Sequence, residues 1–244
     1  MTPTATRRMR AGSYGTRRAT RWLVTIVVIV AVLLGLDFGA RAVAESVMAS
    51  KIQQQGLPTK PSVRIGGFPF LTQVASRDFS HVTISAAGVP AGPVTITTIS
   101  AAATGIRLNS YAFSSGTIGN ISGTALISFG SLAGTLATQF GPLGAILNGA
   151  GLNLTDAGPN EVRATINLLV TQGSAVWRVT RVSGNTLNVH LVSSSGLPSS
   201  LLGSIQDLNL QIPKLPLGLT IDSVSVTPGG VVGLVSGHDV PFGT

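Results

Sequence analysis

The feature that most constrains this chain is an uncharged apolar run near its N-terminus. No charged residue occurs among the fifteen residues from Trp22 to Leu36, and the first one after them is Asp37. Because an α-helix rises about 1.5 Å per residue, this run spans about 22 Å, less than the ~30 Å thickness of a hydrocarbon core. We therefore predict a transmembrane or signal-anchor helix over residues 22–44, in which residues 38–44 supply the last turns.

Charge is distributed unevenly around this run, and the asymmetry predicts its orientation. The preceding segment contains no acidic residue and six arginines: Arg7, Arg8, Arg10, Arg17, Arg18 and Arg21. Basic residues that flank a membrane helix tend to stay in the cytoplasm. We therefore predict a basic cytoplasmic tail over residues 1–21, a single pass through the cell membrane, and an extracytoplasmic (periplasmic) remainder.

A cleaved secretory signal is the alternative interpretation. A basic start, an apolar run and a small-residue site such as Ala42-Val43-Ala44 also form that pattern. The long basic region favours retention, and so does a second helical pattern over residues 39–55. Residues 45–60 are assigned to a juxtamembrane helix and linker, and both interpretations export the rest of the chain. The apolar residues near one face of this second helix are Val43, Val47 and Ile52.

The strong basicity of the chain belongs to its tail. The formal net charge is +8 and the pI is about 11.3, yet the seven basic and six acidic residues of 61–244 nearly cancel. Arginines beside a membrane helix are explained by topology and by contact with anionic lipid. We therefore expect the cytoplasmic membrane, and no nucleic acid, as a partner of this chain.

Residues 61–244 are predicted to form one extracytoplasmic domain built mainly of strands. Polar and apolar residues alternate in short runs separated by glycines and prolines, as in half-buried strands, and Thr98-Ile99 shifts the phase in a way that indicates a bulge or bend. Two helices interrupt the strands, over residues 131–148 and 197–208. This order predicts an α+β fold with a mostly antiparallel, curved sheet wrapped around one or two helices.

A search for catalytic and metal-binding patterns finds none. The sequence has no G-x-S-x-G motif, no glycine-rich phosphate loop and no cysteine. Of the histidines His81, His190 and His238, the last alone has an acidic neighbour, Asp239. We therefore predict a protein that is not an enzyme, with no cofactor and no bound metal.

Three segments resemble a known family. They are IGGFPFLTQ at residues 65–73, LPLGL at 215–219 and SVSVTPGGV at 223–231. Their sequence and order are similar to those of the LmeA-like family of actinobacterial cell-envelope proteins, named for lipomannan elongation, and the resemblance covers about residues 45–240. It implies a non-enzymatic, phospholipid-binding domain outside the cytoplasmic membrane, with a fold similar to tubular lipid-binding proteins.

The low charge of the domain and its uncharged predicted helix favour an apolar groove for phospholipid acyl chains. Ordinary core packing is the alternative role for each residue that we assign to this groove: Phe68, Phe70, Leu71, Phe79, Phe113, Phe129, Leu132, Leu136 and Phe140. Arginine forks suit phosphate, so the head-group candidates are Arg64, Arg77 and Arg107, each of which also fits a solvated strand position.

The proline between two phenylalanines in Phe68-Pro69-Phe70 predicts that the chain leaves the sheet at this segment. Proline fixes φ near −65° and removes a backbone donor, so this segment is expected to turn one or both rings away from the sheet. In one interpretation both rings cap the core. In the other, at least one ring lies at the mouth of the lipid groove and faces the membrane.

The sequence thus predicts a membrane-anchored lipid-binding protein that supports cell-envelope lipid or lipoglycan assembly. Two alternatives remain: a non-catalytic scaffold that binds a membrane enzyme of envelope biosynthesis, and an enzyme that acts on envelope glycolipid. A scaffold predicts an exposed apolar patch with no cavity behind it. An enzyme predicts a cluster of carboxylates or histidines in space.

Overall fold

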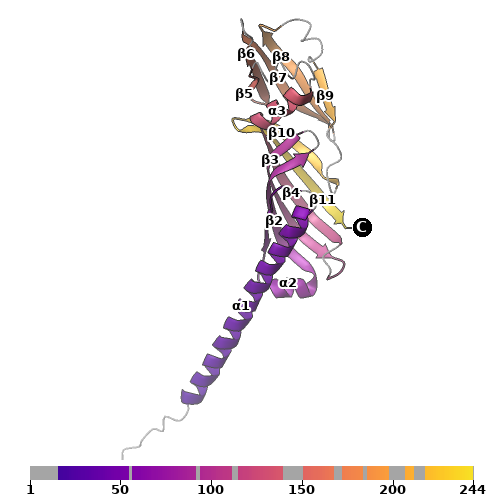
Figure 1. Ribbon diagram of the computed structural model, residues 1–244. Coiled ribbons are helices and arrows are strands. Elements are labelled where there is room, and N and C mark those ends of the chain that lie inside the picture. The colour runs from indigo at the N-terminus through magenta and orange to yellow at the C-terminus, as the bar shows by residue number, and fades with distance from the viewer. Residues whose placement is uncertain are drawn as a thin grey trace, which may run out of the picture.

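The computed structural model describes residues 16–54, 57–91, 94–111, 115–139, 151–167, 172–183, 186–197, 207–211 and 218–243. It is elongated, with a long helix projecting from one end and two sheets placed one beyond the other (Figure 1). All strand pairs are antiparallel. The predicted α+β class with mostly antiparallel strands is therefore confirmed.

The first sheet has six strands and lies nearer the long helix (Figure 1). Its central strands are long, and the C-terminal hairpin adds the last two strands beside the fourth one. In spatial order the strands are β1 (Ser62–Gly66), β2 (Asp78–Ala91), β3 (Val94–Leu108), β4 (Gly116–Ser128), β11 (Gly230–Phe242) and β10 (Thr220–Thr227).

The second sheet has five strands in sequence order: β5 (Asn153–Gly158), β6 (Glu161–Asn167), β7 (Gln172–Ser183), β8 (Thr186–Ser195) and β9 (Asp207–Gln211). Helix α3 (Phe129–Gln139) follows β4 directly and lies where the two sheets meet (Figure 1). Its Leu132 packs against a core that contains Val162 of β6, and Val226 of β10 packs there as well. This shared core joins the two sheets.

Helix α1 (Thr16–Gln54) is continuous for 39 residues, which corresponds to about 58 Å. Within the described residues it is the one helix long and apolar enough to cross a membrane, over Val24–Gln54. Its first part projects away from the sheets and exposes its apolar side chains, whereas Ala49 near its end belongs to the core of the first sheet (Figure 1). One continuous helix therefore forms both the projecting apolar segment and a part of the core of the first sheet.

The predicted face of the helix after residue 39 is only partly correct. Ile52 packs against the core, but Val43 and Val47 are exposed. The side chains that face the domain together with Ala49 are Ala40, Ala44, Met48 and Ile52. Small alanine side chains let a helix approach a strand closely, and this close packing decides the face.

The predicted change of phase at Thr98-Ile99 is present, but it involves no register shift. Strand β3 keeps one register with β2 and with β4 through these residues, yet Ile96 and Ile99 are both half-buried although they are three residues apart. Gly88 of β2, which lies opposite Thr97, has φ of +65°. The alternation shifts again at Gly105, which has φ of +63°, so that Ala103 and Ile106 are both buried although they too are three residues apart. Glycine adopts this left-handed conformation without steric cost.

The two predicted domain helices lie partly outside the described residues. Helix α3 covers the first part of the predicted 131–148 helix, and residues 140–148 are outside the described chain. For the predicted 197–208 helix, residues 198–206 are also outside it. Its last two positions differ from the prediction, because strand β9 begins at Asp207 and pairs with β8.

Candidate functional site

The first element of the candidate site is the junction between α1 and the short helix α2 (Phe70–Ser76). Asp37, on α1, is buried with 4% of its surface exposed. Its carboxylate accepts hydrogen bonds from the backbone N–H groups of Phe70 (2.9 Å) and Leu71 (2.7 Å). The N-terminal N–H groups of a helix have no partner within it, and Pro69 offers no side-chain acceptor. Asp37 therefore caps α2 from a different helix.

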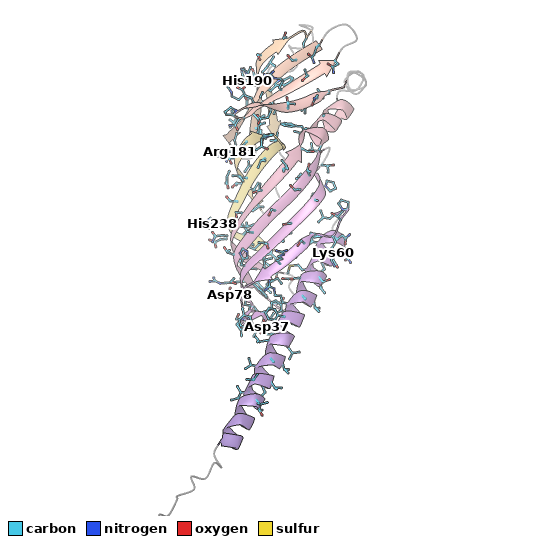
Figure 2. All side chains as sticks on the ribbon, turned by 90° about the vertical axis from the view of Figure 1, so that its left-hand side faces the viewer. Asp37, Lys60, Asp78, Arg181, His190 and His238 are labelled. Atoms are coloured by element: carbon cyan, nitrogen blue, oxygen red, sulfur yellow. The ribbon has the colours of Figure 1, made fainter. Side chains whose placement is uncertain are left out.

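A second carboxylate on α1 fixes the helix to the edge of the first sheet. Strand β1 is an edge strand, and its Ile65 donates its backbone N–H to Glu45 Oε1 at 2.7 Å. Arg41 Nε lies 2.9 Å from the same oxygen, and Lys60 Nζ donates to Ser46 Oγ at 3.0 Å. Helix α1 thus covers an edge that would otherwise present unpaired backbone groups. From Asp37 onward, α1 is part of the folded domain (Figure 2).

The segment Phe68-Pro69-Phe70 leaves the sheet as predicted, and its two rings separate. Phe70 is 3% exposed and packs on Phe79, with ring centroids 6.1 Å apart. Phe68 is 63% exposed and stacks on Phe38 of α1, with centroids 6.3 Å apart. One ring therefore belongs to the core and the other to the surface beside the apolar part of α1.

The face of the first sheet that packs on α1 is apolar, and we call it the inner face. Near α1 its residues are buried, as are Val63, Ile65 and Val82. Farther toward α3 the same face is only half-buried and carries small side chains. The small residues, which lie side by side on four neighbouring strands together with the larger Ile99, are Ala86, Ala101, Gly123, Ala125 and Gly233.

The inner face has open space above it at Gly233. A Cβ atom added at Gly233 would meet no heavy atom within 4 Å, although this residue pairs with Ala125 of β4 and Val224 of β10. Half-buried apolar surface with free space above it can accept an extended hydrocarbon chain. This part of the inner face is the best candidate for a lipid site among the described residues.

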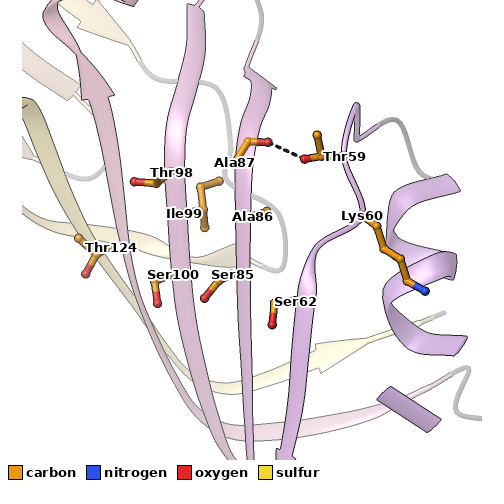
Figure 3. Close-up of a pocket in the computed structure, with 10 residues that line it drawn as sticks. All are labelled: Thr59, Lys60, Ser62, Ser85, Ala86, Ala87, Thr98, Ile99, Ser100 and Thr124. Carbon is orange, nitrogen blue, oxygen red and sulfur yellow. Dashed lines mark hydrogen bonds between the residues drawn. The ribbon is translucent and has the colours of Figure 1, made fainter. Parts of the chain in front are cut away.

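The opposite, outer face of the first sheet is polar and shallowly hollowed. A row of hydroxyl side chains crosses four strands in register: Ser62, Ser85, Ser100 and Thr124. They line an open hollow of about 470 Å³, beside which Thr59 Oγ1 donates to the carbonyl of Ala87 at 3.1 Å (Figure 3). A neighbouring hollow of about 340 Å³ shares Ser100 and Thr124 and extends to Asp222. The first hollow is also lined by Ala87 and by parts of Ala86 and Ile99, so its lining combines hydroxyl and apolar groups.

Two of the three arginines predicted to contact a head group lie at the same end of the first sheet. Arg77 follows α2, donates to the carbonyl of Asn109 at 3.0 Å, and places its guanidinium carbon 5.4 Å from the ring centroid of Tyr111. Arg107 lies across from Asp78 in the strand register. Arg107 is exposed on the outer face, between the buried residues Ile106 and Leu108. Arg64 is exposed on the same face but lies on the edge strand β1, across from Thr83.

The predicted groove residues are distributed over three regions. Phe70 and Phe79 are in the core of the first sheet, Phe68 and Leu71 are exposed beside α1, and Phe129 and Leu132 pack in the core shared with the second sheet. The side chains of Phe113, Leu136 and Phe140 are outside the described part of the structure. Their assignment to a lipid groove remains a prediction.

Sequence reasoning missed Phe38 and the small residues of the inner face. Phe38 follows the acid that ends the apolar run, which marks it as the first residue at the domain boundary. The small residues of the inner face could have been found from small residues at alternate positions of one strand, such as Ala101 and Ala103. Only large residues were considered as groove lining, although small ones are what leave space.

The titratable groups of the described residues form no metal-like cluster. None of their histidines and carboxylates gather in groups of three or more. His190 Nδ1 lies 2.6 Å from Asp207 Oδ1 on the second sheet, where both side chains are exposed, while His238 lies on the first sheet (Figure 2). This His190–Asp207 pair was not predicted, because the strand pairing that forms it is not visible in the sequence.

Comparison with known proteins identifies relatives of the chain. Uncharacterized proteins of Mycobacterium tuberculosis and Mycobacterium bovis are 27% identical to it over 243 residues, which cover 93% of this chain and 68% of the relative. No solved structure matches the chain significantly. The model of the LmeA-like phospholipid-binding family matches residues 35–236, which include Asp37, α2, the second sheet and the first sheet up to residue 236 of β11. The chain therefore belongs to the LmeA-like phospholipid-binding family.

Proposed function

We propose that this protein is anchored in the cell membrane by α1 and holds phospholipid acyl chains against the inner face of the first sheet, on the extracytoplasmic side. The observation that carries this proposal is the half-buried row of small residues with open space at Gly233, in a member of a phospholipid-binding family. Its role is to bind lipid, without catalysis, in support of cell-envelope lipid or lipoglycan assembly.

Burial of hydrocarbon supplies enough free energy for such binding. Each buried methylene contributes about 0.8 kcal/mol, so one long acyl chain contributes several kcal/mol after the cost of ordering it. The inner face needs no charged residue for this interaction. Arg77 and Arg107, at the end of the sheet nearest α2, are the residues that we assign to the phosphate of the head group.

The contacts of α1 support retention of the anchor. Cleavage after Ala44 would remove Asp37, whose carboxylate accepts the N–H groups of Phe70 and Leu71. It would also remove Ala40, which packs against the core. The family match begins at residue 35, inside α1 and before this cleavage site. The extracytoplasmic domain over residues 61–244 is thus completed by the second half of α1.

The proposal is tested by native mass spectrometry of the full-length protein extracted from its own membrane. Gly233→Leu fills the open space of the inner face and is expected to reduce bound phospholipid several-fold. Thr124→Leu adds the same side chain to the outer face of neighbouring β4 and is the matched control, expected to bind lipid as the wild type does.

The outcomes separate the alternatives. Wild-type protein that carries no lipid and takes up none from added vesicles would contradict the lipid-binding function and favour the scaffold for a membrane enzyme. Equal lipid loading of the wild type, Gly233→Leu and Thr124→Leu would place the lipid site elsewhere than the inner face.

A further inference from the structure

The apolar run of α1 is too short to cross a bilayer before the domain begins. Asp37 is buried under α2, and Arg41 pairs with Glu45 beside β1, so the turns after Leu36 are committed to the domain. Residues 38–44 therefore cannot lengthen the span as the sequence suggested. Fifteen uncharged residues reach about 22 Å, some 8 Å less than a typical hydrocarbon core.

Apolar side chains surround the point where α1 meets the domain. Phe38 comes from α1, Phe68 from the segment before α2, and Leu71 from the first turn of α2, and all three are exposed. We call these three residues the rim. They are held together by the Phe38–Phe68 ring stack and by the hydrogen bond from the Leu71 N–H to Asp37.

The other end of α2 carries an aromatic residue and a cation of the kind found at membrane interfaces. Tyr111 is exposed, donates its hydroxyl to the carbonyl of Ala75 in α2, and lies beneath the guanidinium of Arg77. Figure 1 shows α2 beside α1 at the end of the first sheet from which α1 projects. The aromatic and basic residues are therefore near the rim, at the same end of the molecule.

We propose that the rim is embedded in the outer leaflet, so that the bilayer surface itself is the binding partner of this end of the domain. The inference rests on the proposed anchoring by α1. A helix that is too short draws its flanking residues toward the lipid, and here those residues are apolar. Tyrosine favours the head-group region, and arginine is attracted to anionic lipid. The first sheet then begins at the lipid surface, where an acyl chain can reach the inner face without crossing water.

Spin-label depth measurements on the full-length protein test this proposal. The chain contains no cysteine, so single cysteines can be introduced by Phe68→Cys and Leu71→Cys. Two controls on the second sheet match them in exposure: Val182→Cys (61% against 63% for Phe68) and Val192→Cys (42% against 41% for Leu71). Val30→Cys reports on the anchor. The proteins are reconstituted in vesicles of phosphatidylcholine and phosphatidylglycerol, and accessibility to oxygen is compared with accessibility to a water-soluble nickel complex.

The rim labels are expected to be more accessible to oxygen than to nickel, whereas the labels at positions 182 and 192 behave as in water. If the label at position 30 is in lipid while those at 68 and 71 match their controls, the rim proposal is overturned and the anchor stands. If the label at position 30 is itself in water, the anchor is wrong and the rim proposal falls with it.

A lengthened anchor gives an independent measurement. Seven leucines inserted after Val30 add about two helical turns and extend the uncharged run to about 33 Å. Because the insertion is close to a whole number of turns, the residues after it keep nearly the same orientation about the helix axis. The uncharged run is then long enough to cross the hydrocarbon core by itself, so the rim need not enter the outer leaflet. The label at position 68 is then expected to become accessible to the nickel complex, and an unchanged depth would contradict the role assigned to the short span.

Discussion

Asp37 of α1 accepts the backbone N–H of Phe70 across a separation of 33 residues, at 2.9 Å. This contact joins an apolar helix to a domain by satisfying donors that α2 cannot satisfy itself. An acid at the end of an apolar run would ordinarily be assigned to solvent. Its burial here shows that the run stops where the domain starts.

Replacement of Asp37 by alanine is expected to lower the free energy of unfolding by about 1–3 kcal/mol, because the buried N–H of Phe70 in α2 loses its acceptor. Asp37→Asn keeps one oxygen acceptor and should cost less. Chemical unfolding of the detergent-solubilised protein, followed by circular dichroism of the strands, measures both variants. Equal stability of Asp37→Ala and the wild type would show that the cap contributes nothing.

Phe70 and Phe68 are expected to respond in opposite ways to truncation. Phe70→Ala removes a buried ring that packs on Phe79 and should cost about 3–5 kcal/mol of unfolding free energy. Phe68→Ala removes an exposed ring and should change stability by no more than about 0.5 kcal/mol. The sequence left open which ring is exposed, and the structure buries Phe70 and exposes Phe68. A Phe68→Ala protein as unstable as Phe70→Ala would contradict this assignment.

Much of the strand content could be predicted from the sequence, whereas the strand order could not. Alternation of polar and apolar residues marks a strand such as β2 on its own. It carries no information about partners, and so the return of β11 to β4 and the division into two sheets were not foreseen. The His190–Asp207 contact depends on the same long-range pairing.

The contacts of α1 escaped prediction for a different physical reason. Large apolar residues such as Val43 were expected to face the domain, yet the helix packs through Ala40, Ala44 and Ala49. In an apolar helix near a membrane, hydrophobicity does not distinguish lipid-facing from domain-facing sides. Close approach of the helix to β1 selects small side chains, and this selection depends on the backbone geometry of both elements.

The start of the chain is expected to control domain stability even without the membrane span. A chain that begins at Gly35 keeps Asp37 and Ala40, whereas one that begins at Glu45 loses both. We expect the longer chain to have the higher melting temperature in the same detergent, because it retains the α2 cap and the alanine contacts with the core. Equal melting temperatures would support the interpretation of residues 1–44 as a dispensable signal.

Arg77 is expected to influence which phospholipid is bound. Its guanidinium lies over Tyr111 at the end of the sheet next to α2, and each basic residue near an anionic surface contributes about 1 kcal/mol. Arg77→Gln should therefore lower the ratio of phosphatidylglycerol to phosphatidylcholine bound by the protein about fivefold, measured by native mass spectrometry after incubation with mixed vesicles. Arg64→Gln removes another exposed arginine, on the edge strand β1, and is the control that should leave this ratio unchanged. Because Arg77 also donates to the carbonyl of Asn109, the melting temperature of each variant is measured in parallel. A folded Arg77→Gln protein with the wild-type lipid ratio would exclude Arg77 from head-group recognition and leave Arg107 as the remaining candidate at that end of the sheet.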